Sequence, residues 1–245
     1  MSVKTIKQPE PSMRVQPTPT GKQRPLHSGD RLSRAEFERR YQAHPEIRKA
    51  ELIEGVVYVS SPIRYEQHAD PHFNIIGWLA VYRAATPGVK GGDNVTLRLD
   101  FENEVQPDAV LRLEPALGGQ STVTEDDYLE GAPELIVEIA ASSASYDLHD
   151  KRRVYARNGV REYIVAQTYE QYLDWFIWRE GVYESLQADE QGVLRSEVFP
   201  GLWLQPATLW AGDLATMLAV LQEGLASPEH AAFVEGLKAK MTADR

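Results

Sequence analysis

Three acidic residues lie in segments where acidic residues are rare. Asp108 is part of the apolar run Val-Gln-Pro-Asp-Ala-Val-Leu, and Glu138 interrupts the run Leu-Ile-Val-Glu-Ile. A Leu-Ile pair nearer the N-terminus is flanked by Glu51 and Glu54, and either could be the third acid. A carboxylate inside a buried strand must be paired, hydrogen-bonded or bound to metal. Several carboxylates that converge at strand ends typically bind a hard cation, so the sequence predicts a Mg²⁺ or Mn²⁺ site.

A lysine is spaced to lie beside these acids. Residues 147–158 are predicted to form a helix, in which Leu148, Lys151 and Tyr155 share one face. Leu148 and Tyr155 are the residues expected to face the sheet, so Lys151 would place a cation near the carboxylates. In a phosphodiester site the Lys151 ammonium group would orient the attacking water or stabilise the developing negative charge. The alternative is a lysine that extends along the surface to solvent.

Hydrophobic periodicity predicts the elements that must position these residues. The expected elements are a short helix over 33–42, a strand or bent hairpin over 51–60, a helix that starts at Asp70-Pro71, strands over 95–101, 105–113, 134–140 and 163–166, an antiparallel ribbon over 172–199, and helices over 209–225 and 228–241. The strands over 134–140 and 163–166 enclose the Lys151 helix in a βαβ unit, and the first of them is apolar on both faces. We therefore expect an α/β domain with a mixed central sheet flanked by helices and an additional antiparallel ribbon.

Composition sets the outer limits of the domain. Residues 1–29 contain five prolines and few large apolar residues, so they are predicted to be a disordered basic tail. The main domain is expected over 30–225, followed by a C-terminal helix over 226–245.

Charge and cysteine content exclude several classes of protein. The chain of 245 residues has a net charge of −10, divided into +6 over the first 50 residues and −16 over the rest. This balance argues against a protein that coats nucleic acid nonspecifically, although acids that hold divalent metal can still bind phosphates. With no cysteine there is no thiol nucleophile and no Cys-based metal site. The sequence has neither a long apolar run nor a secretory signal, which favours the cytoplasm and no membrane partner.

Two further groups of residues allow a functional interpretation. His68 and His72 have the spacing of a zinc pair, but Pro71 between them argues against one continuous helix. The aromatic residues Tyr172, Trp175, Phe176 and Trp178 could stack on bases, but alternation in a core strand explains most of them.

Several short blocks together resemble the Uma family of restriction endonucleases. The blocks are Glu51-Leu52-Ile53-Glu54-Gly55, Pro107-Asp108-Ala109-Val110-Leu111, Glu134-Leu135-Ile136-Val137-Glu138-Ile139, and Asp147 with Lys151, Tyr155, Gly159-Val160 and Glu162-Tyr163. The family is similar to the PD-(D/E)XK nuclease superfamily in fold and metal site. The resemblance implies that Asp108 and Glu138 are metal ligands and that Glu51 completes the metal shell. Ala140 stands where the superfamily has its lysine, and Lys151 takes the place that the Uma family uses instead. His72 also resembles a histidine common in the family, which implies a role on the phosphate side of the site.

The resemblance implies a Mg²⁺- or Mn²⁺-dependent endonuclease whose substrate is expected to be DNA. Its catalytic residues would be Glu51, Asp108, Glu138 and Lys151. The alternative is a catalytically inactive module of the same fold that binds nucleic acid or a protein partner, and a weaker one is a hydrolase of another phosphoester. A homodimer would suit an enzyme that cuts two strands.

Overall fold

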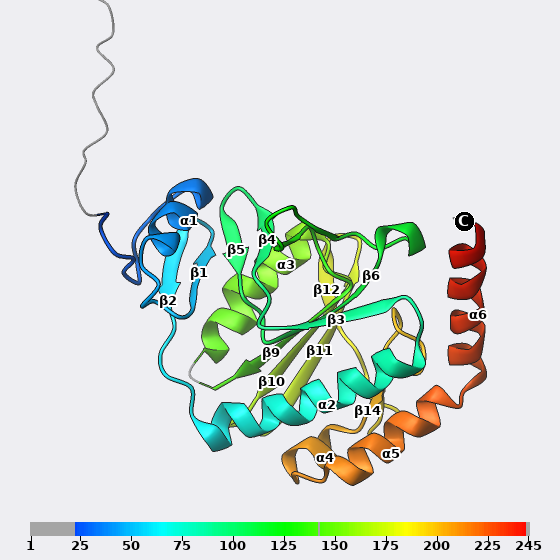
Figure 1. The fold of residues 1–245 in the computed structure, drawn as a ribbon. Coiled ribbons are helices and arrows are strands. Elements are labelled where there is room, and N and C mark those ends of the chain that lie inside the picture. Colours follow the sequence, from blue (N-terminus) through cyan, green and yellow to red (C-terminus); the bar gives the residue numbers. More distant parts are fainter. Residues whose placement is uncertain (1–22, 142, 244–245) are drawn as a thin grey trace, which may run out of the picture.

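A six-stranded mixed sheet forms the centre of the molecule (Figure 1). The computed structural model describes residues 23–141 and 143–243. The strand order is β12 (Val182–Ser185), β11 (Tyr172–Arg179), β10 (Glu162–Gln167), β9 (Leu135–Ala140), β6 (Ala109–Leu113) and β3 (Val89–Asp93). Strands β9 and β10 are parallel, and the other neighbours are antiparallel. The predicted mixed α/β sheet is confirmed, and β9 and β10 lie at its middle.

A second sheet lies beside the first one. Its strand order is β2 (Val56–Val59), β1 (Ala50–Ile53), β5 (Asn103–Val105), β4 (Leu97–Asp100), β8 (Leu129–Glu130) and β7 (Thr122–Val123). Strands β1 and β2 form a hairpin whose turn is Glu54-Gly55, with φ angles of 50° and 72°. Two short strands, β13 (Leu194–Arg195) and β14 (Trp203–Leu204), form a separate antiparallel pair.

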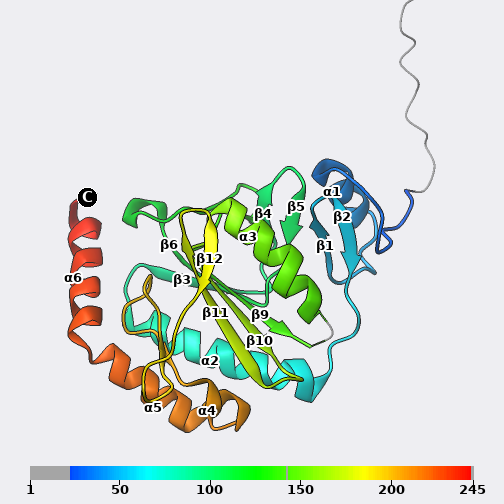
Figure 2. The same cartoon turned by 180° about the vertical axis from the view of Figure 1, so that it is seen from behind.

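Helices cover both faces of the central sheet (Figures 1 and 2). The helices of the described residues are α1 (Arg34–Gln42), which packs on β1, and α2 (Asp70–Ala85), α3 (Arg152–Asn158), α4 (Pro206–Trp210), α5 (Leu214–Leu225) and α6 (Pro228–Ala243). A 3₁₀ turn η2 (Pro115–Leu117) and two π-helical segments, η1 (Tyr65–Ala69) and η3 (Tyr146–Lys151), complete the helical elements of the described residues. Segments η1 and η3 lead directly into α2 and α3. Among the described residues, no helix combines the length and apolar character that crossing a bilayer requires.

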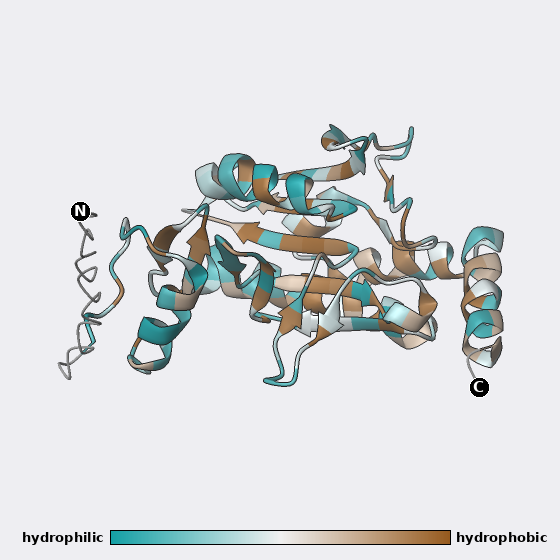
Figure 3. Ribbon diagram, turned by 90° about the horizontal axis from the view of Figure 1, so that it is seen from above, coloured by the Kyte–Doolittle hydropathy of each residue, from teal (hydrophilic) through white to brown (hydrophobic). Residues whose placement is uncertain are grey.

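Alternation along the central strands divides the core into two layers. Val137 and Ile164 face α2, where they join Trp78 and Tyr82. Ile136 and Ala140 of β9 and Val110 of β6 face the other side, where they pack against α3 and the second sheet. Because both faces are covered, β9 is buried along its whole length. Figure 3 shows these hydrophobic strands between layers whose outer surfaces are largely hydrophilic.

The N-terminal part has a small core of its own. Ser33 caps α1 by accepting a hydrogen bond from the Glu36 amide, as the sequence predicts. Phe37 of this helix packs with Leu26 and with Leu52 of β1. The predicted tail over 1–29 falls mainly outside the described residues. Its last part is described, and because Leu26 is buried there, ordered structure begins before residue 30.

Four predicted boundaries were wrong. The chain is already helical before Asp70, since the His68 and Ala69 amides both donate to the Arg64 carbonyl. The strand expected over 105–113 is divided between two sheets. Strands β11 and β12 of the expected ribbon pair antiparallel as predicted but belong to the central sheet, and the third predicted strand shortens to β13. The helix expected over 209–225 is two helices, α4 and α5, with Gly212 at a φ of 66° between them.

Candidate metal and active site

Four carboxylates meet at one end of the central sheet. They come from four elements: Glu51 from β1, Asp108 from the segment before β6, Glu138 from β9, and Asp147 from η3. Ala109 pairs with Val137, so Asp108 lies beside Glu138 on the face that α3 covers. All four acids are at least nine-tenths buried. The strands and the helix therefore bring Glu51, Asp108 and Glu138 to the same place, and Asp147 joins them.

Lys151 lies at the centre of this cluster. Its Nζ is 3.0 Å from Glu51 Oε1, 3.0 Å from Glu138 Oε1 and 3.4 Å from Asp147 Oδ1. Tyr155, one helical turn later, donates a hydrogen bond of 2.8 Å from its hydroxyl to Glu138 Oε1. The lysine is 5% exposed, so it does not extend to solvent.

Asp108 has a separate set of partners. Its Oδ1 lies 3.2 Å from Lys49 Nζ, and its Oδ2 accepts from the Ile139 amide at 2.8 Å and lies 3.2 Å from His68 Nε2. The His72 ring contacts the Asp108 carbonyl oxygen at 2.8 Å. The two histidine rings are 5.6 Å apart and approach different oxygens of one residue. His72 therefore contacts the backbone of the site rather than a carboxylate of the cluster.

Burial and neighbouring charges shift the pKa values of these acids in opposite directions. Burial and the surrounding carboxylates raise the pKa of Glu138 to about 8, against the opposing charge of Lys151. Burial likewise raises the pKa of Asp147. For Asp108 burial is outweighed by His68, Lys49 and the Ile139 amide, which lower the pKa. Burial also opposes the charge on Lys49 and Lys151, but the adjacent carboxylates raise the pKa of both.

The oxygen donors of this cluster suit a hard cation. Asp147 Oδ1 is buried and accepts no hydrogen bond, and the second oxygens of Glu51 and Glu138 accept none from a described residue. Four acids also outnumber the two lysines, so the cluster carries surplus negative charge once all four acids are ionised. Within residues 23–141 and 143–243, however, no group of three or more His, Asp or Glu is arranged to hold a metal ion directly. Lys151 fills the centre, so a cation bound there would compete with its ammonium group.

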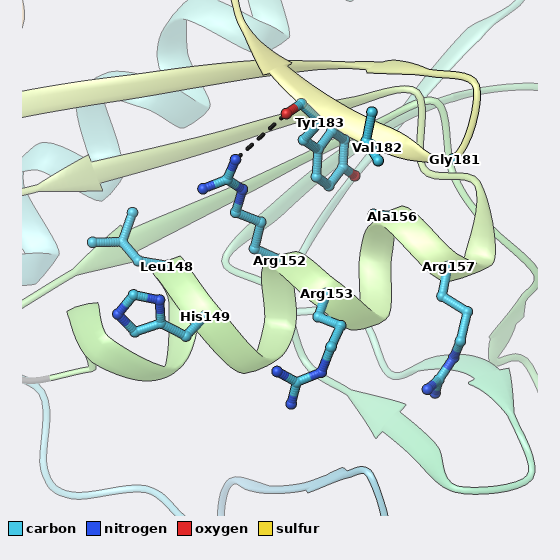
Figure 4. A pocket seen from close by; sticks show the side chains of 9 residues that line it. All are labelled: Leu148, His149, Arg152, Arg153, Ala156, Arg157, Gly181, Val182 and Tyr183. Carbon is cyan, nitrogen blue, oxygen red and sulfur yellow. Dashed lines mark hydrogen bonds between the residues drawn. The ribbon is translucent and has the colours of Figure 1, made fainter.

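Glu54 belongs to a different group of residues. Its carboxylate accepts from Arg153 Nε at 3.1 Å and from Arg157 Nη1 at 3.4 Å, on the outer face of α3. These arginines, with Arg152 and Tyr183, line an open cavity of about 600 Å³ between α3 and β12 (Figure 4). Of the two acids that the sequence leaves open, only Glu51 contacts Lys151.

Sequence reasoning missed three residues of the cluster. Lys49 lies two positions before Glu51, which places both side chains on one face of an extended segment. Asp147 lies four positions before Lys151, on the same helical face. His68 was set aside because Pro71 was expected to interrupt the helix. Each spacing was visible, but only the tertiary structure shows that the residues meet.

The aromatic residues that the sequence assigns to core packing or to base stacking are partly buried and partly exposed. Trp175 and Phe176 are buried in the two layers of the core, as alternation predicts. Trp178 donates from its Nε1 to the Ala156 carbonyl oxygen at 2.8 Å. Tyr172 is exposed.

Comparisons with known proteins give first the fold of the chain and then its family. A crystal structure described as "a putative nuclease belonging to DUF820 from Anabaena variabilis" has a similar fold, with a TM-score of 0.50 and 12% sequence identity. The match covers 66% of this chain and 90% of that chain. The two proteins therefore share a fold. Residues 34–207 match the family Uma2, described as "Putative restriction endonuclease", and the chain belongs to this family. No curated protein matched the chain.

Proposed function

We propose that the protein is a Mg²⁺- or Mn²⁺-dependent endonuclease of the cytoplasm that hydrolyses phosphodiester bonds in DNA. The observation that carries this proposal is the set of buried carboxylates around Lys151, in a chain of a nuclease-like family. Asp108 and Glu138 would hold the cation, and Glu51 would support it. Their oxygen donors are of the type that Mg²⁺ and Mn²⁺ prefer.

Each side chain around the carboxylates has a distinct proposed role. Lys151 would orient the attacking water and stabilise negative charge on the phosphoryl oxygens, without a covalent intermediate. Tyr155 holds the Glu138 carboxylate in place through its hydroxyl. Lys49 and His68 fix the Asp108 carboxylate at the sheet end. When bound, the cation would supply Lewis-acid stabilisation of the reacting phosphate.

A cleavage assay tests the proposal directly. Double-stranded DNA, single-stranded DNA and RNA are incubated with the protein in Mg²⁺, Mn²⁺ or EDTA. We expect cleavage with either metal and none in EDTA. No cleavage of any substrate in either metal would contradict an endonuclease. Light scattering tests the associated proposal of a homodimer, in which two-fold symmetry presents two centres to two strands.

One observation favours the alternative of an inactive module that binds nucleic acid or protein. Lys151 neutralises Glu51 and Glu138 from within, so the cluster is held together without a metal. Calorimetry with Mg²⁺ or Mn²⁺ separates the two proposals. An enzyme is expected to bind the cation with measurable heat, whereas an inactive module need not bind it.

Metal affinity is expected to rise with pH between about 6.5 and 9. Burial raises the pKa of Glu138 to about 8, so this acid must release a proton before it can serve as a ligand. A raised pKa also means that the folded, metal-free protein binds the extra proton. This proton on Glu138 stabilises the folded state: the contribution to the free energy of unfolding is complete below the ordinary glutamate pKa and is lost as the pH rises through about 8. The melting-temperature increase caused by Mg²⁺ should therefore be larger at pH 8.5 than at pH 6.5.

The matched variant for this experiment is Glu138→Gln, which cannot titrate. It is expected to give a small Mg²⁺ response with no pH dependence over the same range. An equally steep pH dependence in Glu138→Gln would show that another group controls metal binding.

Glu51→Gln and Glu54→Gln are expected to behave differently. Glu51 contacts Lys151 in the cluster, so its substitution should weaken both the Mg²⁺ response and cleavage. Glu54 makes half-exposed ion pairs, so its loss should cost less than about 1 kcal/mol of stability and leave the Mg²⁺ response intact. Thermal melts with and without Mg²⁺ measure both effects. A loss of the Mg²⁺ response in Glu54→Gln but not in Glu51→Gln would show that Glu54, and not Glu51, is the third acid of the metal site.

A further inference from the structure

Exposed aromatic residues lie on segments whose neighbouring residues contact the carboxylate cluster or the strand end that carries it. Seven aromatic side chains are exposed among the described residues, and five of them belong to segments that border the cluster. These five are Tyr65, Phe73, Tyr146, Tyr169 and Tyr172. Single exposed aromatic residues are normal on any protein, but a concentration of them around one site indicates an interaction.

Two of these residues lie on the helix that contacts Asp108. Tyr65 begins η1, three positions before His68, whose Nε2 is 3.2 Å from Asp108 Oδ2. Phe73 follows His72, which contacts the Asp108 carbonyl oxygen. Both aromatic side chains are 72% exposed, whereas the histidines turn toward the site.

The other three lie on segments beside Glu51, Asp147 and Glu138. Tyr146 directly precedes Asp147, and its ring packs edge-on against Tyr58 at 4.8 Å, opposite Glu51 in the β1–β2 hairpin. The turn between β10 and β11 carries Tyr169, and Tyr172 is the first residue of β11 after it. This turn is fixed beside the end of β9, because the Thr168 amide donates to the Ala140 carbonyl oxygen at 3.0 Å. Figure 1 shows that the β10–β11 turn and the start of α2 lie at the same end of the sheet.

Aromatic faces recognise nucleobases that are not already stacked in a duplex. Each base that stacks on an aromatic side chain contributes about 5- to 150-fold in affinity, almost independently of sequence. In a duplex the faces of the bases are covered by their neighbours, so unpairing must come first. Charge alone gives little attraction here. Arg48 and Arg64 are exposed near the site, but the exposed acids Glu66, Asp70 and Glu170 lie on the same segments.

We propose that this end of the protein binds unpaired nucleotides, by stacking their bases on Tyr65, Phe73, Tyr146, Tyr169 and Tyr172 around the carboxylate cluster. The substrate class would be a single strand, a flap or a locally opened duplex. This inference rests on the proposed nuclease function and specifies which form of nucleic acid reaches the site.

The test measures binding separately from cleavage. Fluorescence anisotropy is recorded with a labelled single-stranded oligonucleotide, the matching blunt duplex, and the duplex with a short single-stranded flap, in EDTA and again in Ca²⁺. The single strand and the flap are expected to bind at least tenfold more tightly than the blunt duplex. Phe73→Ala and Tyr169→Ala should each weaken single-strand binding about tenfold, whereas Phe73→Trp should retain it.

The matched control is Phe101→Ala. Phe101 is 84% exposed but lies in the turn between β4 and β5, outside the three segments that carry the five aromatic residues. Its substitution should leave binding unchanged, and melting curves should show that all variants are folded. Equal affinity for single strand and duplex, or unchanged binding in both Phe73→Ala and Tyr169→Ala, would overturn the inference. Metal-dependent cleavage of a blunt duplex under those conditions would still support the nuclease, so the two failures can be distinguished.

Discussion

Lys151→Ala is expected to reduce DNA cleavage by about 10²–10³-fold while metal binding persists. The ammonium group is the cation closest to Glu51, Glu138 and Asp147, and one electrostatic stabiliser commonly contributes this much to a rate. Metal affinity should increase, since the lysine no longer competes for the same carboxylates. Nicking of a supercoiled plasmid and calorimetric titration with Mg²⁺ measure the two effects.

The same substitution should strongly destabilise the metal-free protein. It removes the shared partner of three buried carboxylates, and breaking a buried ion pair commonly costs about 3–5 kcal/mol. Mg²⁺ should recover much of this loss in a thermal melt. Lys151→Arg is the control, and it should rescue stability better than cleavage because a planar guanidinium cannot replace a compact ammonium. Wild-type cleavage by Lys151→Ala would show that the lysine has no catalytic role.

Asp108→Ala is expected to remove both metal binding and cleavage. This carboxylate is one of the two proposed ligands, and it also satisfies the Ile139 amide and the charge on Lys49. Its removal leaves the buried Ile139 amide without that partner, whereas Lys49 is partly exposed and keeps its hydrogen bond to Asn94, so a loss of about 1–3 kcal/mol in folding free energy is expected. Urea denaturation measures the stability, and titration with Mn²⁺ measures metal binding.

Asp108→Asn separates the chemical role from the structural one. The amide oxygen can still accept from the Ile139 amide, so this variant should be more stable than Asp108→Ala and equally inactive. Asp93→Asn is the surface control, since the Asp93 carboxylate is half exposed and its polar partners among the described residues are the neighbouring Asn94 and the His72 ring. Full activity in Asp108→Asn would exclude this residue as a metal ligand.

The central sheet was predictable because its signals are local. The apolar run Leu135-Ile136-Val137 is buried on both faces, and Gly159 ends α3 with a φ of 79°, as the Asn-Gly pair indicates. The second sheet was not predictable in this way. Strands β7 and β8 have two residues each, and the pairing of β4 with β8 joins distant segments with no shared periodicity.

The candidate site was predictable in its residues but not in its partners. An acid within an apolar strand is conspicuous, and Lys151 shares a helical face with Tyr155, which contacts the same carboxylate. His68 was missed because Pro71 suggests a helix start. Proline has no amide hydrogen to satisfy, and a π-helical turn before it keeps the chain helical through Tyr65. Such a turn leaves no clear pattern in the sequence.

The location of Glu51 has a consequence for partial unfolding. This residue and Lys49 belong to the β1–β2 unit, whose small core is built on Leu26, Phe37 and Leu52, whereas Glu138 and Lys151 belong to the central layers. Opening of the small unit alone would withdraw one acid and one lysine from the cluster and leave the central sheet intact. We therefore expect the carboxylate cluster to open with a free energy smaller than that of global unfolding, and hydrogen exchange at the Leu52 amide would measure it.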